Sequence, residues 1–188
     1  MYRKRMRIID LTCDNENAMQ QCAQMLYESF IDHAPEAWPT LEAVLEEVQE
    51  SLSEERISRV AIDDAGDVIG WIGGIHSYNG HAWELHPLVV KASERGQGIA
   101  RILVRDLETI IKARGAVTLY LGTDDEDNRT SLSNVDLYPN VWKHVASIEN
   151  RGGHPFAFYQ KMGFVIVGVL PDANGPGKPD ILMAKRIA

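Results

Sequence analysis

Residues 93–103, SERGQGIARIL, place two closely spaced glycines directly ahead of an apolar pattern with helical period. A predicted strand, AWELHPLVV (82–90), precedes this segment, and another, VTLYLGT (117–123), follows it. A strand, a long helix and a second strand of these lengths predict a right-handed crossover between parallel strands. The apolar residues of the predicted helix, which Gly115 ends, are Ile99, Ile102, Leu103, Leu107, Ile110 and Ile111.

The segment ahead of this crossover predicts an antiparallel meander. The turn DDAGD joins 60–62 to 68–75, and Asn79-Gly80 leads into 82–90 as a second hairpin. Helices are expected over 17–30 and about 41–51, the second capped by Thr40. Further along, short helices are expected within 139–149 and 154–163, and strands over 164–170 and 181–187. The fold class is therefore α/β, or α+β by strict naming, with a mixed sheet covered by helices.

Length and composition favour a single soluble domain over residues 1–188. The formal net charge of −8 argues against a nucleic-acid partner, because phosphate binding needs a basic face. We expect no membrane span, since no apolar run approaches about 20 residues. Cys13 and Cys22 lack a metal-ligand spacing, so we expect no metal and two unpaired thiols in a reducing compartment. The basic N-terminus lacks the apolar region of a signal peptide, so we expect a cytoplasmic location.

Acidic residues gather in two stretches. The run 41–56 carries six Glu, which we interpret as a solvated helix face, and Asp124–Asp127 are four consecutive acids. Asp124 and Asp125 follow the predicted strand 117–123 at the end where α/β sheets place ligands, and they suit a polyamine substrate. For Glu126 and Asp127 we favour loop solvation. The long polar segment 124–153 is expected to be functional or an interface.

The glycine-rich segment has two interpretations from its residues alone. The unpaired N–H groups at a helix start favour an anion such as a phosphate, and Gly96 and Gly98 allow its close approach. A plain strand-to-helix turn is the alternative. The segment is not a Walker loop, because no Gly-Lys-Ser/Thr follows, and the GxGxxG fingerprint is incomplete.

The order of meander, Arg-x-x-Gly-x-Ala loop, helix, strand and Tyr-x-Lys-x-Gly-Phe resembles the GNAT superfamily of acetyl-CoA-dependent N-acetyltransferases. The resemblance implies that this loop, Arg95, Gly96, Gln97, Gly98, Ile99 and Ala100, holds the pyrophosphate of coenzyme A. It also implies that backbone amides of Leu88, Val89 and Val90 contact the pantetheine and polarise the acetyl carbonyl. Pro87 cannot donate to a ladder, so we expect an irregular strand there. In the superfamily a bulge separates this strand from the next one. The resemblance therefore implies a mostly antiparallel sheet whose central parallel strand pair is splayed apart.

A narrower resemblance rests on WELHPLVV (83–90), LGTDDE (121–126), HPFAFYQKMGF (154–164) and PDANGPGKPDI (171–181). These stretches are similar to the aminoglycoside 6′-N-acetyltransferases, which are bacterial antibiotic-resistance enzymes. The resemblance implies that acetyl-CoA is the cosubstrate and that an aminoglycoside 6′-amine attacks it directly in a ternary complex. It further implies a homodimer.

Three residues are candidates for the chemistry. Glu84 and His86 are two apart in a strand and so share one face, where they could bind an ammonium group and accept its proton. The resemblance favours Glu84 as the base, whereas the ordinary pKa of imidazole favours His86, and the choice stays open. Tyr159 matches the tyrosine that protonates the departing thiolate in many relatives; a core tyrosine is the alternative.

Two aromatic residues are candidates for the floor of a sugar site. Trp38 lies between Glu36 and Pro39, although a buried tryptophan is an equal alternative, and Tyr78 is a second candidate. The family pattern is broken at one point, because many relatives carry Asn seven residues before the tyrosine, where this chain has Gly152.

Two other functions fit the same sequence. One is a GNAT enzyme that acetylates a polyamine or a protein amine, since an acidic site serves any of these substrates. The other is a coenzyme A-binding module that has lost catalysis.

Overall fold

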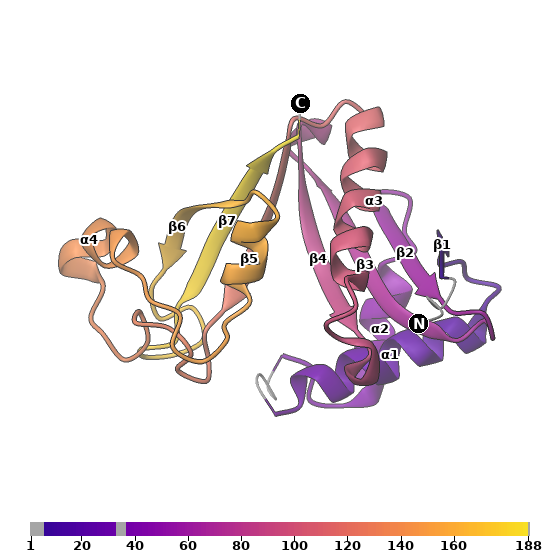
Figure 1. Cartoon of the computed structure of the whole chain (residues 1–188), viewed down its shortest axis with the longest axis horizontal. Helices are drawn as coiled ribbons and strands as arrows, with labels where there is room; N and C mark the ends of the chain where they lie inside the picture. Colours follow the sequence, from indigo (N-terminus) through magenta and orange to yellow (C-terminus); the bar gives the residue numbers. More distant parts are fainter. Residues whose placement is uncertain (1–5, 33–36, 188) are drawn as a thin grey trace. The chain divides into compact units, whose positions relative to one another are not determined.

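The computed structural model describes residues 6–32 and 37–187. The chain divides into two compact units, Met1–Val117 and Thr118–Ala188. Within each unit the neighbouring strands pair antiparallel, and each unit has its own helices (Figure 1).

The first unit contains four antiparallel strands in chain order, β1 (Arg7–Asp10), β2 (Arg56–Ile62), β3 (Val68–Ser77) and β4 (Ala82–Val90). The predicted meander is confirmed, including the turn at Asn79, whose φ of 55° is the left-handed conformation that asparagine tolerates. Strand β1 was not predicted. It has only two apolar residues, Ile8 and Ile9, and is held by its pairing with β2.

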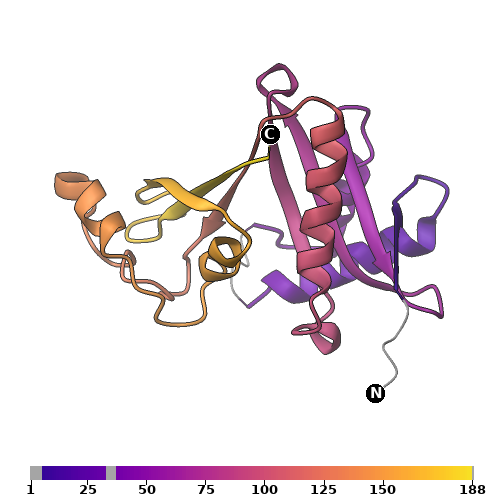
Figure 2. The ribbon, with the colours of Figure 1, turned by 45° about the horizontal axis from the view of Figure 1, so that its top comes forward.

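Helices cover both faces of this sheet. Helix α3 (Ile99–Ala113) lies on one face, and α1 (Glu16–Phe30) and α2 (Leu41–Glu50) lie on the other (Figures 1 and 2). The predicted cap of α2 is confirmed, because the Thr40 hydroxyl accepts from the N–H of Ala43 at 3.2 Å. The apolar stripe of α3 is buried at Ile99, Leu103, Leu107 and Ile111, as its spacing predicted. Ile102, which the predicted stripe also included, is 44% exposed.

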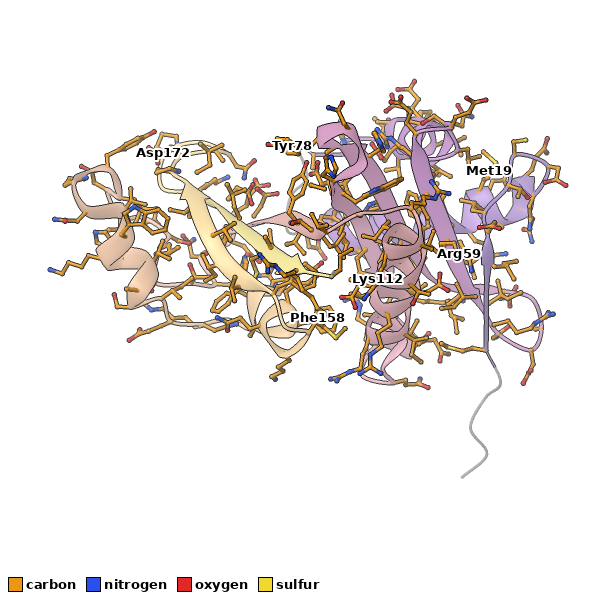
Figure 3. All side chains as sticks on the ribbon, turned by 90° about the horizontal axis from the view of Figure 1, so that it is seen from above. Met19, Arg59, Tyr78, Lys112, Phe158 and Asp172 are labelled. Carbon is orange, nitrogen blue, oxygen red and sulfur yellow. The ribbon has the colours of Figure 1, made fainter. Side chains whose placement is uncertain are left out.

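One arginine ties three elements of this unit together. Arg59 on β2 (labelled in Figure 3) donates to Asp10 of β1 at 2.6 Å and to Asp106 of α3 at 2.8 Å. Burial opposes the charge of its guanidinium, but these two carboxylates outweigh burial and raise the pKa of Arg59. The arrangement links the short β1 strand and the middle of β2 to α3.

The second unit contains β5 (Thr118–Asp124), β6 (Val165–Leu170) and β7 (Asp180–Arg186), with β7 between the other two. Helix α4 (Val141–Ala146) packs against β6, and α5 (Phe156–Lys161) packs against β7. The strands and short helices predicted after residue 117 are confirmed, and Gly163, with φ of 90°, follows the end of α5.

Candidate functional site

Strand β4 is irregular at Pro87, as expected. Ile72 pairs with Leu88 and Gly74 pairs with Leu85, so two residues of β4, His86 and Pro87, lie opposite Gly73 alone. This is a bulge, in which the extra residue interrupts the ladder. The two strands approach closely here, because a Cβ atom built on Gly73 would lie 2.2 Å from the His86 carbonyl oxygen.

The exposure of β4 alternates along the strand. Glu84, His86 and Leu88 are half-buried, whereas the residues between them are buried. This alternation agrees with the prediction that Glu84 and His86 share one face. Leu88, Val89 and Val90 form the end of the strand and pair with Ile72, Trp71 and Gly70 of β3.

The structure brings Trp38 and His86 together. Their ring centroids are 6.0 Å apart with the planes tilted by 33°, and Phe30 meets Trp38 edge-on at 5.0 Å. Trp38 is half-buried, so its side chain is neither a core tryptophan nor fully exposed. Two residues predicted to bind substrate thus lie side by side in the first unit.

A third residue joins this pair, and the sequence did not single it out. The Oε1 atom of Glu47 lies 3.8 Å from Nε2 of His86 and accepts from Nη1 of Arg56 at 2.8 Å. The other five glutamates of the run 41–56 are exposed, which agrees with a solvated face, but Glu47 is half-buried. Glu47 directly precedes Val48, which belongs to the buried stripe of α2. This position was the sequence signal that could have indicated a half-buried side chain.

Tyr78 lies at the connection between β3 and β4 and is labelled in Figure 3. Its side chain is 76% exposed and its φ is 50°. A role of Tyr78 in substrate binding stays a prediction.

The glycine-rich loop runs directly into α3. Gly96 and Gly98 have φ of 79° and 87°, a left-handed conformation that favours glycine, and Gly98 is the N-cap residue. The Ile102 N–H donates to the Gly98 carbonyl at 3.2 Å, so the N–H groups of Ile99, Ala100 and Arg101 precede the first intrahelical bond. Such groups, with the helix dipole, can bind an anion. The Ile99 side chain is buried, so this residue can offer only its backbone.

Two side chains shape this loop. Arg95 donates through Nε to the Val90 carbonyl at 3.1 Å and through Nη2 to the Ser29 hydroxyl at 2.9 Å. Its guanidinium therefore connects the end of β4 and the last turn of α1 to the loop. The Gln97 amide donates to Glu94 at 2.9 Å across the exposed turn.

Asp124 ends β5 and is exposed in the second unit. Its Oδ1 atom accepts from Asn174 at 2.5 Å, and its carbonyl oxygen lies 2.9 Å from Nε2 of His154. Asp124 keeps an exposed carboxylate, so its predicted role toward a cationic substrate stays a prediction.

Asp125 has different surroundings from those expected of a substrate ligand. Its side chain is fully buried, and its carboxylate accepts from the N–H groups of Arg129 and Thr130 at 2.7 and 2.8 Å and from the Ser133 hydroxyl. Burial by itself raises the pKa of this carboxyl, but the hydrogen bonds outweigh burial and lower it. The expectation that Asp125 contacts the substrate directly is therefore corrected. Its carboxylate instead accepts hydrogen bonds that fix the loop following β5.

His154 also has a structural environment. Its ring is buried, with Nε2 at the Asp124 carbonyl and Nδ1 accepting from the Phe156 N–H at 3.2 Å. Burial lowers the pKa of this imidazole, and a neutral ring suits one donor and one acceptor nitrogen. Asn150 bonds the backbone N–H and carbonyl of His154 at 2.9 and 2.8 Å. These side chains hold the start of α5 beside the end of β5.

Tyr159 lies on α5 and is 8% exposed. Its ring meets Phe158 and Phe164 edge-on, at 5.1 and 5.6 Å between centroids. Burial raises the pKa of its phenol, so the hydroxyl keeps its proton at neutral pH. A protonated phenol is the form that a general acid needs, although a core tyrosine would have the same environment.

Within the described ranges 6–32 and 37–187, no group of three or more His, Cys, Asp or Glu side chains is arranged to hold a metal ion. In the same part of the chain, no helix has both the length and the apolar character required to span a membrane.

Comparison with known proteins identifies the class. Residues 23–138 match the Acetyltransferase (GNAT) family, so this chain belongs to that family of acetyltransferases. It has the α/β (α+β) fold of the family, with a mixed, mostly antiparallel sheet flanked by helices. The comparison with curated proteins gives no significant match.

Similar solved structures give more detail than the family match about the kind of acetyltransferase that this chain resembles. The chain is 42% identical to an aminoglycoside 6′-N-acetyltransferase complexed with coenzyme A, with a TM-score of 0.90 and 97% of each chain covered. It is 44% identical to the aminoglycoside 6′-N-acetyltransferase from Enterococcus faecium, with a TM-score of 0.87 and the same coverage. A third structure, aminoglycoside 6′-acetyltransferase type Ii, is 36% identical with a TM-score of 0.73 and 97% of each chain covered.

Proposed function

We propose that this protein transfers the acetyl group of acetyl-CoA to the 6′-amine of aminoglycoside antibiotics and so confers resistance to them. The observation that carries the proposal is the 42–44% identity, over 97% of each chain, to two aminoglycoside 6′-N-acetyltransferases. The net charge of −8 also favours the approach of a polycationic substrate.

We propose that residues 1–188 act as one acetyltransferase domain. The family match over 23–138 continues past Val117, where the first compact unit ends.

The cosubstrate is proposed to bind the loop 95–100 through backbone N–H groups that precede the first intrahelical bond of α3. Gly96 and Gly98 leave open space at their Cβ positions, so a pyrophosphate can approach the backbone closely. Arg95 adds positive charge, and residues 88–90 are proposed to contact the pantetheine arm.

In the proposed reaction the neutral amine nitrogen attacks the thioester carbonyl, a C–N bond forms and the C–S bond breaks. The amine loses one proton, and the coenzyme A thiolate gains one. We propose that Glu84 and His86 bind the amine and take its proton, and that Tyr159 protonates the thiolate. Trp38, beside His86, is proposed to contact the sugar ring, and Asp124 to bind a second ammonium group.

A homodimer is proposed from the surface of the second unit. Five large apolar side chains on its α4 and β6 region are at least half exposed, which is unusual for a face turned to water. They are Tyr138, Trp142, Val165, Val167 and Leu170. Sedimentation velocity should give the mass of a dimer, and Trp142→Glu should give a monomer. A monomeric wild type at micromolar concentration would remove this part of the proposal.

A cytoplasmic location is proposed because acetyl-CoA is available there and because Cys13 and Cys22 are both free thiols.

The reaction is tested by measuring release of the coenzyme A thiol from acetyl-CoA. Kanamycin A is compared with an analogue that lacks the 6′-amine. Turnover with kanamycin A alone is expected. Turnover with both compounds would mean a different amine position, and turnover with neither would move the assignment to another class of amine.

A further inference from the structure

Glu47 stands apart from the acidic run in which it lies. Its side chain is 16% exposed, whereas that of Glu50, one turn further along α2, is 67% exposed. Both carboxylates bind the same guanidinium, that of Arg56, at 2.8 and 3.3 Å. Glu47 alone of the two also faces strand β4. A half-buried carboxylate that binds a guanidinium is restricted to few conformations.

The same oxygen atom of Glu47 lies near the imidazole of His86. Nε2 of His86 is 3.8 Å from Oε1, the atom that accepts from Arg56 at 2.8 Å. The indole of Trp38 lies against the same imidazole, with 6.0 Å between ring centroids. The bulge at Pro87 fixes the backbone beneath the ring. The carboxylate and the indole therefore constrain where the imidazole points.

The position of the carboxylate has a consequence for the proton of His86. An imidazole N–H is stabilised when it faces an anion, so the proton of a neutral His86 belongs on Nε2, toward Glu47. The other ring nitrogen, Nδ1, then carries the lone pair. That nitrogen is the one able to accept a proton.

We propose that Glu47 is a positioning residue that holds the neutral His86 with its proton on Nε2 and presents the Nδ1 lone pair to the substrate amine. The proposal rests on the proposed function, in which an amine attacks acetyl-CoA. As the C–N bond forms, the amine proton moves to Nδ1 and gives an imidazolium, whose positive charge Glu47 stabilises. The imidazolium then returns the proton to water.

The first test is a double-mutant cycle with His86. Glu47→Gln should lower kcat/KM for kanamycin A about tenfold, or about 1.4 kcal/mol, a loss within the range usual for the coupling of two neighbouring residues. The KM for acetyl-CoA should not change. Glu50→Gln is the matched control, because it removes the other carboxylate of Arg56 and should have wild-type kinetics. In a His86→Asn background, Glu47→Gln should have no further effect. Additive losses in the double variant would overturn the proposal.

The second test needs no turnover. Long-range ¹H–¹⁵N NMR of the ¹⁵N-histidine protein reports which ring nitrogen carries the proton, and His86→Asn identifies the signals of this ring. The wild type and Glu50→Gln should show the Nε2–H form of His86. Glu47→Gln should at least double the fraction of the Nδ1–H form, and an unchanged fraction would overturn the proposal. If the wild type acetylates no amine, the proposed function fails and this comparison alone decides the role of Glu47.

Discussion

Gly73 of β3 lies directly against the carbonyl group of His86, across the bulge in β4. A Cβ atom at position 73 would be 2.2 Å from that oxygen, a distance that real Cβ atoms essentially never show, and 3.0 Å from its carbon. The bulge places His86 and Pro87 opposite a residue without a side chain. The position of a proposed catalytic residue therefore depends on a glycine in the neighbouring strand.

Gly73→Ala should consequently displace His86 and destabilise the fold. We expect a loss of about 1–3 kcal/mol in the free energy of unfolding, typical of overpacking, and a fall in kcat. Urea denaturation and steady-state kinetics measure the two effects. Gly168→Ala is the control, since its Cβ would meet only Leu182 at 3.7 Å, an ordinary contact. Equal behaviour of the two variants would show that the bulge tolerates a side chain.

Arg95→Ala should weaken binding of coenzyme A. The substitution removes a positive charge beside the proposed pyrophosphate site and the bonds to Val90 and Ser29 that shape the loop. We expect the dissociation constant for coenzyme A to rise about tenfold, as for the loss of one hydrogen bond to a charged group. Isothermal titration calorimetry measures it. Arg105→Ala, which removes the same charge from an exposed position further along α3, should leave it within twofold. An equal loss of coenzyme A affinity in both variants would mean that Arg95 acts only through the overall charge of the protein and not through its position in the loop.

Asp125→Asn should destabilise the protein at neutral pH by about 1–3 kcal/mol, because buried donors lose a charged acceptor. The pKa of Asp125 is lowered in the folded protein, so its ionisation stabilises the fold above the unfolded-state pKa of about 3.9. That contribution is lost as the pH falls through the folded-state pKa. The difference in the free energy of unfolding between wild type and variant should therefore be largest at pH 7 and should decrease below about pH 4.

Denaturant unfolding at pH 7, 5 and 3 measures this narrowing. Asp64→Asn, at an exposed turn between β2 and β3, should track the wild type throughout. If the destabilisation caused by Asp125→Asn were the same at all three pH values, the charge of Asp125 would not stabilise the loop.

Tyr159→Phe should lower kcat while the KM values change little. The phenol is buried and keeps its proton, and general acid catalysis contributes about 100-fold or more to a rate. Steady-state kinetics with saturating acetyl-CoA measure the loss, and Tyr27→Phe on α1 is the control. A wild-type kcat in Tyr159→Phe would assign the residue to the core alone.

The sequence predicted most of the secondary structure because local signals specify it. Pro87 lacks an N–H group, which is sufficient to predict an irregular strand, and the bulge is present. Strand β1 was missed because its four residues carry no alternation, and its stability comes from Arg59 and from pairing with β2. A strand that depends on long-range contacts has little local signal.

The residues of the candidate site also differ in how well the sequence predicted them. Trp38 and His86, predicted separately, lie together in the first unit. Glu47 escaped notice because its significance comes from His86 and Arg56, which are distant in sequence. Asp125 was misread because a carboxylate that follows a strand looks the same in sequence whether it turns to solvent or to its own loop. Burial separates the two cases, and sequence periodicity does not report burial within a loop.

The most direct test of the central claim is the structure of the product. Purified protein, acetyl-CoA and kanamycin A should yield one monoacetylated compound. Two-dimensional NMR should place the acetyl group on the 6′-nitrogen, with one equivalent of coenzyme A thiol released. An acetyl group on another nitrogen, or recovery of unmodified kanamycin A, would contradict the proposed function.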